Sequence, residues 1–460
     1  MTKNPPEPNP KNLSLAQGLG RPKEVQLDAD GLDETEDLWR RAHRVLAAGT
    51  WSVSHGAFRY PNGVFPVLAQ SGAGCRITDT TGAEYVDWMM GWGPVILGYR
   101  HPKVEAAIRE QLAEGPLLSL LHPLEIEVAE RIREVVPCAD GVAFGKNGSD
   151  VLGAAARIAR AHTGRERILV CGYHGFHDWY LASLPSIEGI PRDLRETVEP
   201  FPYGDLAALE SIFEARGPQV AAIVMEPVKT QLPEPGYLAA VRDLAHRHGA
   251  LLIFDELVTA FRLAPGGAQE AFGVEPDLAC LGKAMGNGMP LSALTGREAV
   301  LRSIANVGYG LTFRGETLSL AAAKACLEVL ATEPVTQHLD RVGRNLIAGF
   351  EEAVRTTGVP AELIGPTCRL DISFGPSGSL SALGLQTLFV QELLRHGVLS
   401  NGSLLASYAH DDAAVEQTVR AFHHGLEVVG RASVRGSLEG LLHVPDQAAF
   451  HEPSSLETPP

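Results

Sequence analysis

The stretch from Gly249 to Lys283 reads GALLIFDELVTAFRLAPGGAQEAFGVEPDLACLGK, and its pattern predicts the fold. It contains two continuously apolar runs, residues 250–254, which stop at Asp255, and residues 278–281, which stop just before Lys283. Strands of a parallel sheet are apolar along their whole length when helices cover both faces. Ligands of such open sheets bind beyond the carboxyl ends of the strands, so we expect Asp255 and Lys283 to face one ligand.

Outside this stretch, short apolar runs continue to alternate with segments of helical periodicity. The predicted strands are residues 141–144, 168–171, 220–225, 251–254, 278–281 and 291–295, and predicted helices include residues 150–162, 206–215 and 236–248. Such alternation predicts an α/β domain built on a mainly parallel sheet.

Segments of mixed character flank this region and predict a second, smaller α+β domain. A hairpin is expected where Asp79-Thr80-Thr81-Gly82 separates two short apolar runs, and strands and helices alternate again after residue 370. We expect a flexible N-terminal arm at residues 1–32, the two parts of the small domain at 33–90 and 346–445, the large domain at 91–345, and a flexible tail at 446–460.

The composition is that of an ordinary globular protein with an acidic balance. Thirty-nine basic and 55 acidic residues give a net charge of −16, which argues against nucleic acids and anionic membranes as partners. We find no signal-peptide pattern and no apolar stretch of roughly 20 residues that could span a bilayer. The six cysteines are scattered without C-x-x-C spacing and are expected to pack in the core. A cytoplasmic protein is predicted.

Asn147, Gly148 and Ser149 follow the first strand of the predicted sheet and open a helix. Backbone N–H groups and a hydroxyl at a helix start can hold a phosphate. An ordinary Ser or Asp helix cap is the alternative.

An aromatic-rich loop, CGYHGFHDWY, follows the second strand at residues 171–180. Tyr173 or Phe176 could stack on a flat heterocycle, although a packed loop is the alternative. His174 and His177 are three residues apart, but no Asp, Glu or Cys cluster completes a metal site, so no metal is predicted.

Three neighbouring strand ends carry Glu226, Asp255 and Lys283. A lysine in a partly desolvated pocket has a depressed pKa and forms Schiff bases with carbonyls. An aspartate beside a pyridine nitrogen keeps that nitrogen protonated and preserves the ring as an electron sink. A phosphate site, a stacking aromatic side chain, a strand-end Asp and a Lys are together what pyridoxal 5'-phosphate (PLP) requires.

Six segments of the chain resemble those of a known family. The segments KNGSD, YHGFHDWY, MEP, GALLIFDELVTAFR, LGKAMGNGMPLSA and TFRGETLSLAAA are similar, in order and spacing, to those of class III (subgroup II) aminotransferases of PLP fold type I. The likeness runs from about residue 33 to residue 430, and GWGPVILGYRHPKV looks most like the glutamate-1-semialdehyde aminomutase branch. The resemblance implies a large domain with a mainly parallel seven-stranded sheet plus a smaller α+β domain.

The resemblance also implies site residues. Lys283 would bind PLP covalently and later shuttle the substrate proton, while Asp255 would pair with the pyridine nitrogen. Tyr173 and Val258 would pack on opposite faces of the ring. The implied cofactor-binding set is Asn147, Gly148, Ser149, Tyr173, His174, Glu226, Asp255, Val258, Lys283 and Thr312. In this set Thr312 reaches in from a neighbouring subunit, which implies a homodimer with its active site at the subunit interface.

The resemblance implies that Trp92 lines the substrate pocket. Arg59 could contact a substrate carboxylate, because a guanidinium can pair with a carboxylate through two hydrogen bonds. An exposed loop Arg is the alternative for Arg59. True aminomutases of the family carry an acid shortly before the segment that matches SYAH, but residues 400–406 contain none. We therefore predict an aminotransferase that moves an amino group from a small-molecule donor to a carbonyl acceptor. The alternatives are an intramolecular 2,1-aminomutase and a PLP-fold protein that binds ligand without turnover.

Overall fold

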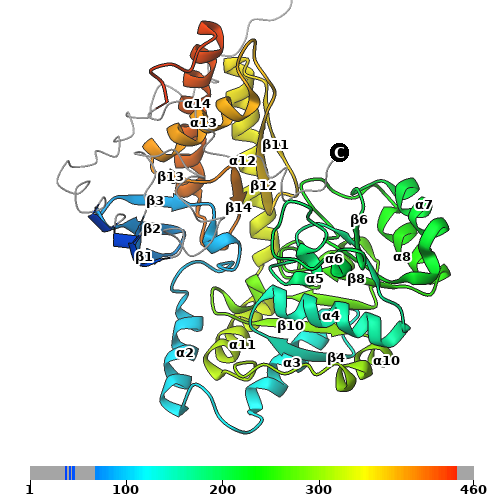
Figure 1. Cartoon of the computed structure of the whole chain (residues 1–460). Helices are drawn as coiled ribbons and strands as arrows, with labels where there is room; N and C mark the ends of the chain where they lie inside the picture. Colours follow the sequence, from blue (N-terminus) through cyan, green and yellow to red (C-terminus); the bar gives the residue numbers. More distant parts are fainter. Residues whose placement is uncertain (1–36, 39–40, 43, 47–67, 443–460) are drawn as a thin grey trace, which may run out of the picture.

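The computed structural model describes residues 37–38, 41–42, 44–46 and 68–442. The predicted N-terminal arm and the predicted C-terminal tail lie outside the described residues. Figure 1 shows the large sheet at one end of the molecule and two smaller sheets with three long helices at the other. No helix in the described part of the chain is long and apolar enough to cross a membrane.

The large sheet has seven strands in the order β4-β10-β9-β8-β7-β5-β6, and a mainly parallel seven-stranded sheet is what the resemblance implies. Only β10 runs antiparallel to its neighbours. The strands are β4 (Gly141–Gly145), β5 (Arg167–Cys171), β6 (Val198–Pro200), β7 (Val220–Met225), β8 (Leu251–Asp255), β9 (Leu278–Leu281) and β10 (Ser292–Gly296). The pattern did not predict β6, because a three-residue edge strand that ends in proline is too short to show a periodicity.

Helices cover both faces of this sheet, which is why its central strands are apolar throughout. On β8, Leu251 and Ile253 face one core cluster with α4 (Gly148–Thr163). Leu252 and Phe254 face another cluster with α7 (Leu206–Arg216) and α8 (Tyr237–Arg247). The remaining helices near this sheet are α2 (Pro102–Glu114), α3 (Pro123–Val135), α5 (Asp178–Leu181), α6 (Arg192–Arg195), α9 (Gly267–Phe272), α10 (Glu298–Leu301) and α11 (Thr317–Thr332).

The two smaller sheets combine segments from both ends of the described chain. The hairpin β2 (Arg76–Asp79) and β3 (Glu84–Asp87) forms as predicted, and Asp79 Oδ1 closes its turn by accepting from the Thr81 amide at 2.9 Å. Strand β13 (Val398–Leu399) then pairs in parallel with β3, so segments about 300 residues apart form one sheet. The other strands are β1 (Ala69–Ala73), β11 (Ala361–Ile364), β12 (Arg369–Phe374) and β14 (Ser403–Leu405), and the helices are α12 (Val335–Thr357), α13 (Ala382–Arg395) and α14 (Asp412–Arg435).

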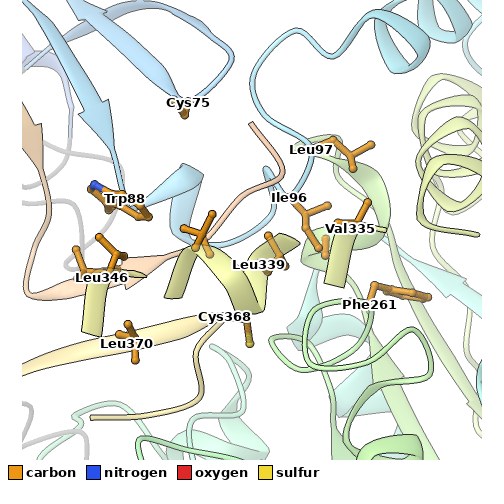
Figure 2. Packing of buried hydrophobic residues seen from close by; sticks show 14 of the residues in the cluster. Cys75, Trp88, Ile96, Leu97, Phe261, Val335, Leu339, Leu346, Cys368 and Leu370 are labelled. Atoms are coloured by element: carbon orange, nitrogen blue, oxygen red, sulfur yellow. The ribbon is translucent and has the colours of Figure 1, made fainter. Parts of the chain in front are cut away.

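One continuous apolar core joins the small sheets to the large one. In Figure 2, Trp88 after β3, Leu346 of α12 and Leu370 of β12 lie around the same interior, with Phe261 on the side of the large sheet. The Trp88 ring stacks on His410 with centroids 3.8 Å apart, and its Nε1–H donates to Thr418 Oγ1 at 2.9 Å. All six cysteines are buried free thiols, as expected for core residues.

Candidate active site

A cavity of about 530 Å³ lies at the carboxyl ends of the parallel strands, where it is bordered by residues of the small sheets. It has walls from the loop after β3, from the loops after β4, β5, β7, β8 and β9, and from β12 and β14. Its lining includes Trp92, Asn147, Gly148, Ser149, Tyr173, Glu226, Asp255, Val258, Lys283, Arg369, Asn401 and Leu405. Segments far apart in the sequence therefore meet in one hollow.

Asp255 is the last residue of β8, and its carboxylate is buried and held from two sides. Its Oδ2 accepts a hydrogen bond from His174 Nδ1 at 2.9 Å, and its Oδ1 accepts from the Leu257 amide at 3.2 Å. The next residue, Glu256, points away and accepts from the Ala268 amide at 2.8 Å. Because strand residues alternate between faces, only one acid of this pair can reach the cavity, and that acid is Asp255.

Lys283 follows β9 and borders the same cavity. Its backbone has a φ of 41°, a left-handed conformation that costs a non-glycine residue energy and often accompanies a functional site. Burial lowers the pKa of the Lys283 amine, while the charges of Asp255 and Glu226 oppose that shift. A lowered pKa raises the fraction of neutral, nucleophilic amine at a given pH.

The first turn of α4 forms a polar cradle in the cavity wall. Asp150 Oδ2 accepts from the amides of Lys146 at 3.0 Å and Asn147 at 2.7 Å, which fixes the loop that precedes the helix. A side chain at position 148 would place Cβ 2.3 Å from Leu257 Cδ1, so only glycine fits there. Ser149 Oγ is oriented by a hydrogen bond of 2.9 Å from the Phe176 amide. The helix start is thus shaped to hold an anion.

The aromatic loop after β5 is fixed to the neighbouring strand end. The Tyr173 amide donates to Glu226 Oε1 at 2.8 Å, and the Tyr173 ring, in a side chain 57% exposed, meets Tyr180 edge-on at 5.7 Å. Tyr173 and Val258 both line the cavity, so an aromatic and an aliphatic side chain border the same space.

The structure brings most of the predicted site residues to this cavity. His174 is fully buried and contacts Asp255 from behind rather than lining the hollow. Thr312 is exposed and does not line the cavity of its own chain. Arg59 lies outside the described residues. Among the described residues, His174 and His177 have no third ligand-type side chain close enough to complete a metal site.

The sequence pattern missed two cationic lining residues, Lys229 and Arg369. Neither side chain forms a hydrogen bond or an ion pair with another described residue. Lys229 follows the MEP segment by two positions and could have been noticed there. Arg369 begins a small-domain strand and is directly opposite Leu405 across the β12–β14 pair. No local pattern could place it beside Lys283.

These residues fit PLP. The α4 cradle admits no side chain at position 148, Asp255 offers a carboxylate held by His174, and Lys283 offers a desolvated amine. The other ring nitrogen of His174, Nε2, is buried and has no hydrogen-bond partner among the described residues. The ring is thus held by the hydrogen bond from Nδ1 to Asp255. The fold and site define a PLP-dependent enzyme of fold type I.

The chain belongs to the class-III aminotransferase family, whose model matches residues 59–403. It is 33% identical over 410 residues to the 3-aminobutyryl-CoA aminotransferase of Cloacimonas acidaminovorans, covering 86% of this chain and 98% of that protein. It is also 35% identical over 416 residues to the glutamate-1-semialdehyde 2,1-aminomutase of Methanothermobacter thermautotrophicus, covering 84% and 97%.

Solved structures show the same fold. The PLP internal aldimine form of the Sphingopyxis sp. MTA144 FumI protein superposes with a TM-score of 0.83 at 29% identity, covering 87% of this chain and 98% of that one. An omega-transaminase from Sphaerobacter thermophilus gives 0.79 at 27% identity, covering 86% and 98%. The protein is therefore a PLP-dependent enzyme of the transaminase family.

Proposed function

We propose that this enzyme transfers an amino group from a small-molecule donor to a separate carbonyl acceptor in two half-reactions. The observation that carries the proposal is the meeting of Asp255, Lys283 and the α4 cradle around one cavity. When bound, PLP withdraws electrons from the carbon that bears the transferred amine.

Lys283 holds the cofactor covalently and, once the substrate displaces it, moves the proton at the substrate carbon. Its lowered pKa supports both tasks, because a neutral amine is a better nucleophile and a competent base. Lys283, two residues after the end of β9, borders the same cavity as Asp255.

Asp255 holds a proton on the ring nitrogen, and His174 positions Asp255. The fixed carboxylate is supported by two donors, at 2.9 and 3.2 Å. Val258 and Tyr173 confine the ring, while Asn147, Gly148 and Ser149 bind the phosphate. Glu226 fixes the Tyr173 backbone.

A homodimer completes the site in this proposal. Thr312 is exposed, and the neighbouring Phe313 is 58% exposed. Close by, Leu120 and Leu121 are 83% and 68% exposed, on a segment linked to α11 through the Thr317 amide and Pro116 O at 2.9 Å. Large exposed apolar side chains that cluster in this way are typical of an interface. In such a dimer Thr312 would reach the phosphate bound by the partner subunit. We also propose that the enzyme is cytoplasmic.

One substrate carries a carboxylate in this proposal. Arg369 and Lys229 line the cavity without a hydrogen-bond or ion-pair partner among the described residues. Both residues are half-buried, and a guanidinium pairs with a carboxylate through two parallel hydrogen bonds. Trp92 borders the same space.

The second candidate function is an intramolecular 2,1-aminomutase, which the 35% identity to a protein of that name favours. The lining residues Asn401 and Ser403 are neutral, in the segment where the aminomutases of the family carry an acid. This difference favours transfer between two molecules.

A donor and acceptor screen tests the proposal. Purified holoenzyme is mixed with single amino donors while the absorbance of the bound cofactor is followed, and carbonyl acceptors are then added. We expect a donor alone to bleach the absorbance and an acceptor to restore it. Turnover of one amino aldehyde substrate without any donor would instead establish the aminomutase.

A further inference from the structure

Three side chains that can bind a metal meet between α13 and α14, and none of them lines the active-site cavity. Glu392 lies on α13, His396 follows its last residue, and His424 lies on α14. Their candidate ligand atoms all lie within 4.8 Å of one another. The Glu392 side chain is 4% exposed and that of His424 is 43% exposed, so the cluster is buried on one side and accessible on the other.

His396 is oriented as a metal ligand. Its Nδ1 lies 2.8 Å from the backbone carbonyl oxygen of Glu392, one helical turn earlier. A carbonyl oxygen only accepts, so Nδ1 carries the proton and Nε2 of the neutral ring keeps its lone pair. Metal-binding histidines in proteins are commonly fixed by this kind of hydrogen bond from the other ring nitrogen.

His424 presents its ring beside that of His396, with centroids 4.1 Å apart. Each ring has a nitrogen among the candidate ligand atoms that lie within 4.8 Å of one another.

The Glu392 carboxylate divides its two oxygens between different partners. Oε1 accepts from Arg395 Nη1 at 2.9 Å and from Gln391 Nε2 at 3.1 Å. Oε2 lies 3.7 Å from His424 Nε2, which is longer than a hydrogen bond. Ligand atoms of a tetrahedral ion lie roughly 3.3–3.6 Å apart when each bond is about 2.0–2.2 Å, so the 3.7 Å between His424 Nε2 and Glu392 Oε2 is close to the spacing that such an ion needs.

A cavity of about 310 Å³ adjoins the three side chains. It has room for an ion and for water as a fourth ligand. Arg395 and Arg431 also line it, and their positive charges weaken cation binding. The expected affinity is therefore micromolar rather than the much tighter affinity of a structural zinc site.

We propose that Glu392, His396 and His424 form a site for a divalent transition-metal ion of the zinc type, separate from the PLP site. Two imidazoles and one carboxylate suit Zn²⁺ or Co²⁺, whereas Mg²⁺ and Ca²⁺ prefer oxygen ligands alone. The bound ion joins α13 to α14 and stabilises the small domain. The proposal does not depend on the identity of the amino donor or acceptor.

Binding to the full-length holoenzyme tests the site. Protein stripped with a chelator is titrated with ZnCl₂ by calorimetry, and with CoCl₂ while the visible absorption that reports tetrahedral nitrogen and oxygen ligation is recorded. We expect one ion per chain, no binding of MgCl₂, and a melting temperature about 2 °C or more higher with saturating Zn²⁺.

Matched variants locate the ion. His424→Ala should weaken Zn²⁺ binding about tenfold or more and abolish the rise in melting temperature, whereas His423→Ala, at the adjacent position of α14, should bind as the wild type does. Glu392→Gln supplies a second test that keeps the shape of the side chain. Equal Zn²⁺ binding by His424→Ala and wild-type protein, or no binding by wild-type protein, would overturn the proposal and leave a His–Glu cluster that only packs two helices.

Discussion

His174 Nδ1 donates a hydrogen bond of 2.9 Å to Asp255 Oδ2, and both side chains are buried. The two residues come from the loop after β5 and the end of β8, so the sheet itself sets their separation. The bond fixes the Asp255 carboxylate at the edge of the cavity. In the proposed mechanism this is the carboxylate that keeps the cofactor ring protonated.

Substitutions of Asp255 and of His174 should therefore differ in how strongly they lower kcat. Asp255→Ala should keep covalently bound cofactor but lose about 100-fold or more in kcat. His174→Ala should lose less and shift the pH profile of kcat, because it acts through Asp255. His177→Ala, in the same loop, is the control. Single-turnover absorbance changes measure each rate, and unchanged turnover of Asp255→Ala would disprove its role.

Lys283→Ala should lose covalent cofactor and transamination together. The amine of Lys283 is the one that lies beside Asp255 with a lowered pKa. Borohydride reduction followed by peptide mass spectrometry identifies the modified lysine. Lys229→Ala, which alters another lysine of the same cavity, should retain the modification at position 283. Attachment to a different lysine in the wild-type protein would contradict the assignment.

Mixed dimers should reveal which subunit Thr312 serves. Thr312→Asp should weaken cofactor binding, because an added negative charge repels the phosphate, and Lys283→Ala should be inactive. If Thr312 reaches the partner's site, a mixed dimer of the two variants has one complete site and regains up to half of the wild-type activity per dimer. Thr332→Asp, at an exposed helix end, is the charge control. No recovery in mixed dimers isolated by affinity tags would place Thr312 in its own chain's site.

Arg369→Ala should affect a carboxylate-bearing substrate selectively. Loss of a charge-assisted hydrogen bond is worth about 1.5–3 kcal/mol, so KM for that substrate should rise about tenfold or more. KM for an amine of the same skeleton without the carboxylate should stay unchanged, as should the spectrum of the bound cofactor. Equal changes for both compounds would mean that Arg369 supports the cavity without recognising charge.

His410 should make the fold sensitive to acid. Its Nδ1 accepts from the Ser407 amide at 2.9 Å, and its Nε2–H donates to Asp87 O at 3.1 Å. Burial lowers the pKa of His410 from 6.5 to about 3. Between these two pH values the histidine is protonated in the unfolded chain and neutral in the folded chain. The free energy of unfolding should therefore fall as the pH drops from about 6.5 towards 3. Urea unfolding across this range should show a shallower decline in His410→Gln than in wild-type protein or His423→Gln.

Local sequence predicted most of the large sheet because its central strands are buried on both faces and read as unbroken apolar runs. It also identified Asp255 and Lys283, since a polar residue that ends such a run must lie at the edge of the sheet. The edge strand β6 and the strands β11 and β14 gave no comparable signal, because strands of three or four residues are too short to show a clear period.

The sequence by itself determined the parallel sheet, the strand-end acid and amine, and the glycine-containing helix start, since each follows from local pattern and backbone geometry. Only the tertiary structure decided which of two adjacent acids lines the cavity, that His174 holds it, and that Arg369 and Lys229 line the same cavity. It also brought Glu392, His396 and His424 together from two helices. The physical reason is that these contacts depend on how helices and strands pack across hundreds of residues, which no local period encodes.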